Sequence, residues 1–211
     1  PDLIDEKGRV IIAGIGRFGQ IVNRLVQLSG FKTVVLDNDL ETIELMRRFG
    51  FQGFFGDPTR RELLHAAGIE TARILVVALD DRAATNKLVA YARRVRPDIH
   101  IVARARDRVH VYELYQAGAN DIVREMFDSS LRAGRYVLEN IGLSEYEAAQ
   151  MTQFFFHKDR ENLRALASLW RPDIPVSENK EYVARARELN AELETALVEH
   201  MSADQAQKAR A

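Results

Sequence analysis

The segment Gly14-Ile15-Gly16-Arg17-Phe18-Gly19 has three glycines in the spacing G-x-G-x-x-G. It directly follows the apolar run Val10–Ala13 and opens an amphipathic stretch, which is the strand–turn–helix context in which this spacing binds a phosphate. We expect Gly14 to make the tight turn, Gly16 to let the backbone approach the phosphate, and Gly19 to allow close packing of helix and strand. Free N–H groups at the start of the helix would hold the anion.

Asp37 follows the next β-type run, Thr33–Leu36, and stands 18 residues beyond Gly19. A carboxylate at this position can accept hydrogen bonds from both hydroxyls of a ribose. That chemistry favours an unphosphorylated ribose, as in NAD, AMP or ADP, over NADP. We therefore count Asp37 and the adjacent Asn38 as cofactor-binding candidates, whereas Asp39 can simply be the N-cap of the following helix.

The turn Gly56-Asp57-Pro58-Thr59 closes the third β-type run, and it can be interpreted in two ways. Thr59 and Glu62 have the spacing of a capping box, which is a purely structural role. Asp57 nevertheless lies where the adenine amino group of a nucleotide would need an acceptor. We favour the ligand interpretation for Asp57 and include Thr59 with it.

Charged turns follow the fourth and fifth β-type runs, at Asp80-Asp81-Arg82 and Arg104-Ala105-Arg106-Asp107. Any one of them could be a solvated loop, but in such folds the ligand binds at the carboxyl ends of the strands. Asp80 is therefore a further candidate for the cofactor site. Arg17 and Arg104 are the cations that we expect near a phosphate.

These motifs are separated by alternating strand and helix patterns from Arg9 to about Val123. Several β-type runs are continuously apolar, as strands buried on both faces of a parallel sheet are. Glycines end four of the helical stretches, where C-cap glycines belong. The pattern predicts an α/β fold, with a Rossmann-like doubly wound parallel sheet of about six strands followed by a C-terminal helical extension. The expected strands are 10–13, 33–36, 52–55, 74–78, 99–103 and 121–123, and the expected helices between them are 17–29, 40–49, 59–67, 84–96 and 109–117.

The strands stop after Val123, and the rest of the chain is predicted to be helical. Asp128–Ser130 can cap a helix that runs to about Ile141, and Gly134 inside it suggests close packing at that point. Ser144 and Glu147 form a capping box for a long helix ended near Pro172, and Ser177 is expected to cap a last helix that fades into a polar tail at 203–211. The predicted organisation is a linker (1–8), a nucleotide-binding domain (9–124), a further helix (125–143) and a helical extension (144–211).

Composition limits the possible functions. The chain has 211 residues, 30 Lys and Arg against 31 Asp and Glu, and no Cys. A net charge of −1 provides no general attraction to nucleic acid. Without Cys there are no disulfides, Cys-ligated zinc or cysteine nucleophiles, which fits a reducing compartment. No apolar run reaches the roughly 18–20 residues of a bilayer span. Because the sequence starts at Pro1, we interpret it as a fragment of a longer protein, which leaves a membrane-bound parent possible.

No catalytic arrangement is apparent. The five His residues are scattered, no pair has metal-ligand spacing, and no Ser-His-Asp set can be argued. Three C-terminal helices offer no obvious substrate domain. The residues therefore favour a nucleotide sensor over an enzyme, with a ligand that acts through its different affinities for two conformations.

The ordered set of motifs resembles a known family. The strings Arg9–Gln20, Val35–Asp39, Gly56–Arg60, Ala78–Asp81, Ala103–Asp107 and Arg124–Phe127 are together similar to the cytosolic KTN/RCK regulatory domain of Kef-type glutathione-gated potassium efflux systems of Gram-negative bacteria. The resemblance covers roughly residues 9–158. It implies a homodimer on the cytoplasmic side of the inner membrane, joined to a membrane antiporter domain of the same parent chain, with no catalytic role. Residues 125–143, with Gly134 at the close contact, would then be the dimer crossover helix.

The same resemblance implies two ligands. A nucleotide, often AMP, would occupy the glycine-turn site, with NAD or NADH as the other possibility. Glutathione would bind between subunits and keep the transporter closed, and bulky glutathione conjugates would open it. A flavodoxin-like oxidoreductase is a possible ancillary partner.

Three residues, Arg24, Phe49 and Arg124, match family positions tied to glutathione control, and a fourth, Asp159, aligns near one. Arg24 and Arg124 could pair with the carboxylates of a small acidic peptide, although each could equally form an ordinary surface salt bridge. Phe49 matches an aromatic residue displaced by the conjugate, although as the last apolar residue of its helix it could be a core anchor. The family's asparagine aligns near Asp159, which departs from the pattern. Phe154-Phe155-Phe156 is interpreted as dimer packing.

Two alternatives remain open at this point. One is an NAD(H)-sensing domain of a potassium uptake channel or transporter. The other is a small NAD-dependent oxidoreductase.

Overall fold

The computed structural model describes residues 10–208, so the expected linker at 1–8 lies outside the described residues. The chain divides into two compact units, Pro1–Glu125 and Met126–Ala211. In the first unit the strands are β1 Val10–Ala13, β2 Thr33–Asp37, β3 Phe54–Phe55, β4 Ile74–Val77, β5 His100–Ala105 and β6 Asp121–Arg124. Its helices are α1 Arg17–Leu28, α2 Leu40–Arg48, α3 Arg61–Ala66, α4 Arg82–Val95 and α5 Arg108–Ala117.

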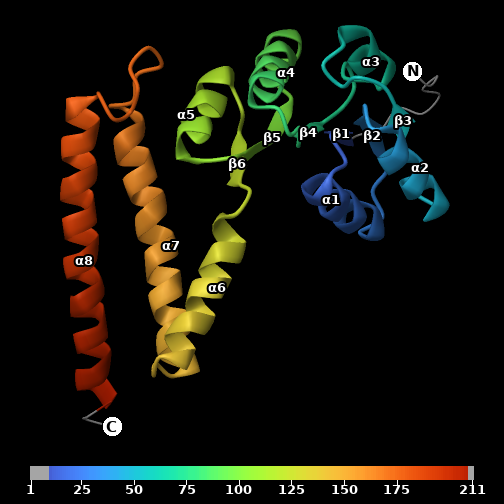
Figure 1. Ribbon diagram of the computed structural model, residues 1–211. Coiled ribbons are helices and arrows are strands. Elements are labelled where there is room, and N and C mark those ends of the chain that lie inside the picture. Colours follow the sequence, from blue (N-terminus) through green and yellow to red (C-terminus); the bar gives the residue numbers. More distant parts are fainter. Residues whose placement is uncertain (1–9, 209–211) are drawn as a thin grey trace. The chain divides into compact units, whose positions relative to one another are not determined.

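The six strands form one parallel sheet in the order β3-β2-β1-β4-β5-β6. This confirms the predicted doubly wound sheet. Figure 1 shows α1 and α2 on one side of the sheet and α3 and α4 on the other. Because both faces are covered, every residue of β1 and β2 is buried, as their apolar sequences predict.

The chain order reverses between β1 and β4, the two central strands, which pair in register from Val10 opposite Ile74 to Ala13 opposite Val77. In open α/β sheets such a switch point lies below the ligand crevice, at the carboxyl ends of the strands. A core cluster that includes Ile12, Val35 and Val76 fixes the central strands beneath this edge. The fold therefore holds the candidate residues on rigid elements.

The boundaries near the third strand differ from the prediction. The strand has only Phe54–Phe55, and α3 begins at Arg61, so Thr59 and Glu62 do not form the expected capping box. Instead, Asp57 Oδ1 accepts hydrogen bonds from both the backbone N–H of Thr59 (2.9 Å) and its hydroxyl (2.7 Å). The Asp57 side chain thus forms a local turn with Thr59 in place of a first helical turn, and α3 begins only after this turn.

Other helix ends in this unit follow their caps. Asp81 caps α4 by accepting from the N–H of Ala84 at 2.6 Å, so α4 starts two residues before the predicted Ala84. Gly30, Gly50, Gly68 and Gly118 follow their helices with positive φ angles, as predicted.

The second unit contains α6 Phe127–Asn140, α7 Glu145–Ala167 and α8 Lys180–Lys208. Figure 1 shows α7 between α6 and α8. The predicted cap at Asp128–Ser130 is wrong, because α6 already begins at Phe127, and its N-cap, Met126, has no side-chain cap hydrogen bond. The capping box of Ser144 and Glu147 is confirmed.

The start of α8 also corrects the prediction. Asn179, not Ser177, accepts the cap hydrogen bond from the N–H of Tyr182 at 3.0 Å. The amide of Asn179 donates to the carbonyl of Leu169 at 2.8 Å, which ties the cap to the end of α7 and explains the choice of residue. The helix then continues to Lys208, beyond the start of the expected polar tail at 203.

Candidate nucleotide site

The glycine turn has the geometry that its spacing predicts. Gly14 has a φ of +94°, and its N–H donates to the carbonyl of Leu36 at 2.8 Å. A Cβ on Gly14 would lie 2.6 Å from the carbonyl oxygen of Ala78, and one on Gly19 would overlap the carbonyl oxygen of Gly14. Both positions therefore require glycine, Gly14 for the turn and Gly19 for the close packing of α1 on β1.

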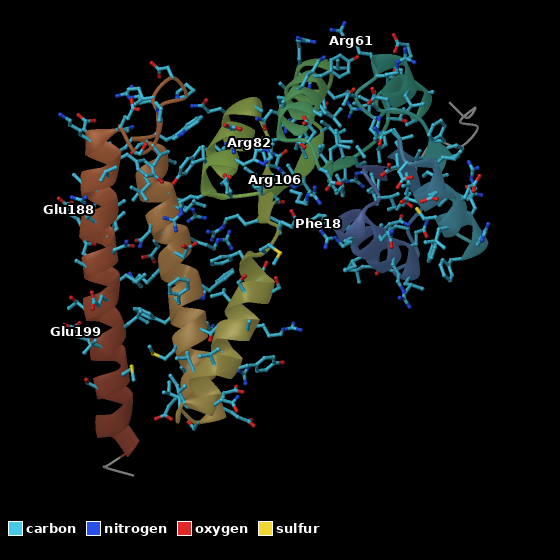
Figure 2. All side chains as sticks on the ribbon, in the orientation of Figure 1. Phe18, Arg61, Arg82, Arg106, Glu188 and Glu199 are labelled. Atoms are coloured by element: carbon cyan, nitrogen blue, oxygen red, sulfur yellow. The ribbon has the colours of Figure 1, made fainter. Side chains whose placement is uncertain are left out.

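Gly16 is different, because a Cβ there would meet nothing within 4 Å. Gly16 is the N-cap of α1 and offers no side-chain acceptor, and the first turn of α1 holds no acidic residue. The N–H groups of this turn are left for an external acceptor, and the helix dipole favours an anion there. Arg17 is exposed and Phe18 is half-buried at the start of α1, where Figure 2 labels it.

Asp37 braces the glycine turn in addition to its expected role. Its Oδ2 accepts from the N–H of Ile15 at 2.6 Å, and its Oδ1 accepts from the N–H of Asp39 at 2.8 Å. Its exposed fraction is only 9%. A carboxylate has about four acceptor positions, so two remain after these bonds for the hydroxyls of a ribose. Sequence reasoning missed the bracing role because no local pattern couples Asp37 to Ile15.

The end of the third strand is fastened beside Asp37. The N–H of Gly56 donates to the Asp37 carbonyl at 2.8 Å, which brings Asp57 to the same edge of the sheet. Asp57 and Asn38 are exposed, and Thr59 is half-buried. The two Thr59 hydrogen bonds both fall on one oxygen of Asp57, so the turn role and a ligand role use different oxygens.

Arg104 is the most buried cation at this edge, with an exposed fraction of 4%. Its Nη2 donates to the carbonyl of Leu79 at 2.7 Å and to Asp80 at 2.6 Å, and its Nη1 lies 3.6 Å from Glu125. Its Nε is buried and has no hydrogen-bond partner within the described residues. A buried guanidinium donor without a partner costs free energy, so an acceptor that reached Nε of Arg104 would stabilise it.

A second polar network joins α4 to α5 beside the same edge. Glu113 accepts from Arg82 at 2.8 and 2.7 Å and from Asn86 at 2.7 Å. The hydrogen bond from Arg82 holds the pKa of Glu113 below its ordinary value, and the same bond raises the pKa of Arg82. Arg82 and Arg106, which belong to this region, are labelled in Figure 2.

His110 completes this network and is buried, with 1% exposure. Burial is the main cause that lowers its pKa, and the nearby charge of Arg82 lowers it further. The ring partners of His110 could not be predicted, because they are Asn86 on another helix, α4, and the backbone N–H of Arg106 in the turn before α5.

The expected glutathione residues lie on separate elements. Arg24 is exposed on α1, Arg124 ends β6, and Asp159 lies on α7 in the second unit with 5% exposure. Phe49 is 71% exposed, so its alternative as a core anchor is wrong. Phe49 follows the buried Ile43 by six residues, or about one and two-thirds helical turns, which turns it away from the packed face of α2.

These residues do not converge within the first unit. α2 packs on β2 and β3, whereas β6 is the edge strand at the other end of the sheet. Four strand spacings separate β2 from β6, or about 19 Å at roughly 4.8 Å each. Phe49 and Arg124 of one protomer thus belong to opposite halves of the sheet.

Two properties of the described residues bear on other functions. No group of three His, Cys, Asp or Glu side chains in this part of the chain could hold a metal ion. Within residues 10–208, no helix combines the length and the apolar character needed to cross a bilayer.

Comparison with known proteins places this site in a family. Residues 10–125 match the TrkA-N domain family, and residues 129–211 match the family described as potassium efflux system KefB C-terminal domain. The Kef C-terminal domain from Shewanella denitrificans, solved in an AMP-bound form, is 38% identical, with a TM-score of 0.71 over 77% of this chain and 99% of that one.

Two further solved structures share the fold. The TrkA-N domain of the inner membrane protein YbaL from Escherichia coli is 25% identical and has a TM-score of 0.57. The match covers 66% of this chain and 100% of that one. The GsuK channel bound to NAD is 24% identical, with a TM-score of 0.55 over 64% of this chain and 24% of that one, which shows a common fold alone. The chain therefore belongs to the TrkA-N (RCK) family and is a regulatory domain of the Kef potassium efflux type.

Proposed function

We propose that this domain binds an adenine mononucleotide of the AMP type at the glycine turn and controls a potassium efflux antiporter in response to glutathione. The observation that carries the nucleotide assignment is the combination at one sheet edge of an uncapped α1 N-terminus at Gly16 and the Asp37 carboxylate. The AMP-bound Shewanella relative supports the same assignment.

The residues fit such a ligand. The phosphate would take the N–H groups above Gly16, where the backbone leaves open space, with Arg17 beside it. The ribose would use the remaining acceptor positions of Asp37, next to Asn38, and Asp57 would accept from the adenine amino group. The unmet Nε donor of Arg104 supports an anion near the same edge, where Arg104 is already paired with Asp80.

NAD or NADH remains the second candidate ligand, because its adenosine half makes the same demands on Gly16 and Asp37. An NAD(H)-sensing domain of a potassium uptake system is the corresponding alternative function. The match of residues 129–211 to the KefB C-terminal family favours the efflux system.

Glutathione, in this proposal, binds across two copies of the chain. Arg24, Phe49, Arg124 and Asp159 would contribute to such a site. Phe49 and Arg124 lie toward opposite ends of one sheet, so a small peptide that contacts both is accommodated better between protomers than within one. The exposed aromatic ring of Phe49 is available to a bulky conjugate.

A homodimer is part of the same proposal, and α6 supports it. α6 has no buried residue, and its Tyr136 and Val137, together with the C-cap residue Ile141, are exposed at 55%, 59% and 71%. Apolar side chains at this exposure favour a protein partner. A Cβ at Gly134 would meet nothing within 4 Å, so the surface of α6 at this glycine is open to close packing by a second copy.

Further partners follow from family membership. The domain would lie on the cytoplasmic side of the bacterial inner membrane, attached to the antiporter domain of its parent chain. A flavodoxin-like oxidoreductase is a further proposed partner, and nucleic acid is not expected. The ligands would act without catalysis, by binding the closed and open states of the transporter with different affinities.

Native mass spectrometry of protein purified without added nucleotide tests the proposal. We expect a dimer that carries AMP and gains the mass of glutathione when the tripeptide is added. A protein that carries NAD and ignores glutathione would favour the uptake alternative. Turnover of NADH with a carbonyl substrate would instead favour the oxidoreductase.

A further inference from the structure

The turn after β5 is held by one histidine. The backbone N–H of Arg106 donates to His110 Nδ1 at 3.1 Å, and the backbone N–H of His110 donates to Asp107 Oδ1 at 2.8 Å. Arg104 lies in β5, two residues before Arg106, and makes the contacts to Leu79 and Asp80 described above. The His110 ring therefore fastens the backbone segment that carries the buried cation of the nucleotide edge.

These contacts fix the protonation state of the ring. A backbone N–H can only donate, so Nδ1 of His110 must be an acceptor and the proton must lie on Nε2. Nε2 then donates to Asn86 Oδ1 at 3.1 Å, and the amide of Asn86 donates to Glu113 at 2.7 Å. Arg82 closes the chain of hydrogen bonds on Glu113. The link to Arg106 requires the neutral imidazole, because a protonated ring has no acceptor at Nδ1.

The surrounding charges act in both directions. Arg82 on α4 and Arg106 in the turn oppose a proton on His110, whereas Glu113 and Asp107 favour it. Burial, with only 1% of the residue exposed, is the largest effect, and it lowers the pKa of His110 below its ordinary value of 6.5. A proton on Nδ1 would also face the N–H of Arg106, so that hydrogen bond would be lost.

We infer that His110 is a positioning residue for the nucleotide site: its neutral ring clamps the β5–α5 turn, and protonation of the ring releases the turn and weakens nucleotide binding. This inference rests on the proposed nucleotide function. By reciprocity, a bound nucleotide makes His110 harder to protonate. Nucleotide affinity and internal acidity are thereby coupled through one side chain.

Calorimetric titration of AMP at about pH 7.5 and about pH 5.5 tests this coupling. The test variant is His110→Asn, because the amide oxygen of Asn can accept from the Arg106 N–H at the place of Nδ1 but does not titrate. The control is His100→Asn, which removes an exposed histidine at the first residue of β5, the end of that strand away from the His110 turn. Titration of the AMP phosphate affects all three proteins alike.

We expect the affinity of the unchanged protein and of His100→Asn to fall about fivefold more between these two pH values than the affinity of His110→Asn. Parallel losses in all three proteins would overturn the inference. Absence of AMP binding to the unchanged protein at about pH 7.5 would instead refute the proposed function.

Nitrogen NMR of the unchanged protein tests the hydrogen bond between the Arg106 N–H and the His110 ring directly. This test remains valid even if the variant does not fold or AMP does not bind. The expected result is a neutral His110 with its proton on Nε2, a titration midpoint below 6.5, and a shift of the Arg106 amide with the same midpoint. A proton on Nδ1, or an Arg106 amide that ignores the titration, would contradict it.

Discussion

The backbone N–H of Ile15 donates a 2.6 Å hydrogen bond to the carboxylate of Asp37, across the gap between two neighbouring strand ends. This contact makes Asp37 a structural member of the glycine turn as well as a candidate ribose ligand. The same carboxylate also accepts from the N–H of Asp39. Substitution of Asp37 is therefore expected to change both the folded state and nucleotide binding.

The first prediction separates these effects with Asp37→Asn and the matched change Asp39→Asn. An Asn at 37 has one acceptor oxygen for two backbone donors, and its NH2 group faces one of them. We expect Asp37→Asn to lower the free energy of unfolding by about 1–3 kcal/mol, the cost of an unmet buried donor. AMP affinity should fall by about tenfold or more, because a ribose acceptor is also lost.

Asp39→Asn makes the same charge change two residues away and keeps an N-cap oxygen for α2. Urea denaturation and calorimetric AMP titration measure the two quantities. Equal behaviour of the two variants would remove Asp37 from the site.

The second prediction uses two glycines of one turn. A Cβ at Gly16 meets nothing within 4 Å, whereas a Cβ at Gly19 overlaps the Gly14 carbonyl oxygen. Gly16→Ala should leave the free energy of unfolding within about 0.5 kcal/mol of the unchanged protein. It should nevertheless weaken AMP binding by about tenfold, because the methyl group occupies the space above the helix N-terminus.

Gly19→Ala should instead destabilise the fold, with a fall in midpoint temperature in the absence of any ligand. Thermal unfolding with and without AMP distinguishes the two cases. A Gly16→Ala protein that binds AMP normally would show that the phosphate does not lie at this turn.

Most of the sheet and the glycine turn could be predicted from the sequence, because both depend on local patterns. Buried parallel strands such as β1 are continuously apolar, and the turn needs glycine at fixed positions. Right-handed crossovers then place helices on both faces of the sheet, whereas the order β3-β2-β1-β4-β5-β6 comes from the structure alone.

The remaining features depend on contacts between distant segments, for which the local sequence carries no signal. Asn179 replaces Ser177 as the cap of α8 because its amide reaches Leu169 at the end of α7. The clamp at His110 needs Asn86 from another helix. The exposure of Phe49 depends on the phase of α2, which a short apolar pattern does not fix well.

The third prediction concerns stability in acid. The pKa of Glu113 is held below its ordinary value of 4.5, mainly by the hydrogen bond from Arg82. A carboxyl with a lowered folded pKa stabilises the protein above its unfolded pKa, and this contribution is lost as the pH falls through the folded pKa. Glu113→Gln should therefore cost about 1.5 kcal/mol near neutral pH and much less near pH 3.

Glu44→Gln, an exposed change on α2, serves as the control and should have the same small effect at both pH values. Urea denaturation at the two pH values gives the comparison. If Glu113→Gln cost as much in acid as at neutral pH, the Arg82–Glu113 pair would not be the source of the pH dependence.

The fourth prediction concerns glutathione. Arg124→Ala should weaken glutathione binding by about tenfold, because a charged hydrogen-bond donor to a carboxylate is removed. AMP should remain bound, since the glycine turn and Asp37 lie at other strand ends. Calorimetry with glutathione and mass spectrometry of the bound nucleotide report the two effects, and Arg94→Ala on α4 is the control for loss of one surface arginine. Unchanged glutathione affinity in Arg124→Ala would remove this residue from the site.

The fifth prediction concerns the dimer and uses α6. In one chain, a Cβ at Gly134 meets nothing within 4 Å, so we expect Gly134→Leu to leave the protomer folded. If α6 packs closely on a second copy at this glycine, the added side chain must push the helices apart, and the dimer should dissociate at concentrations where the unchanged protein remains paired. Arg132→Leu adds the same side chain two residues away, about 200° around the helix, and should leave the dimer intact. Light scattering over a range of protein concentrations measures both masses. A dimer that tolerates Leu at 134 as well as at 132 would place the interface on another surface of the molecule.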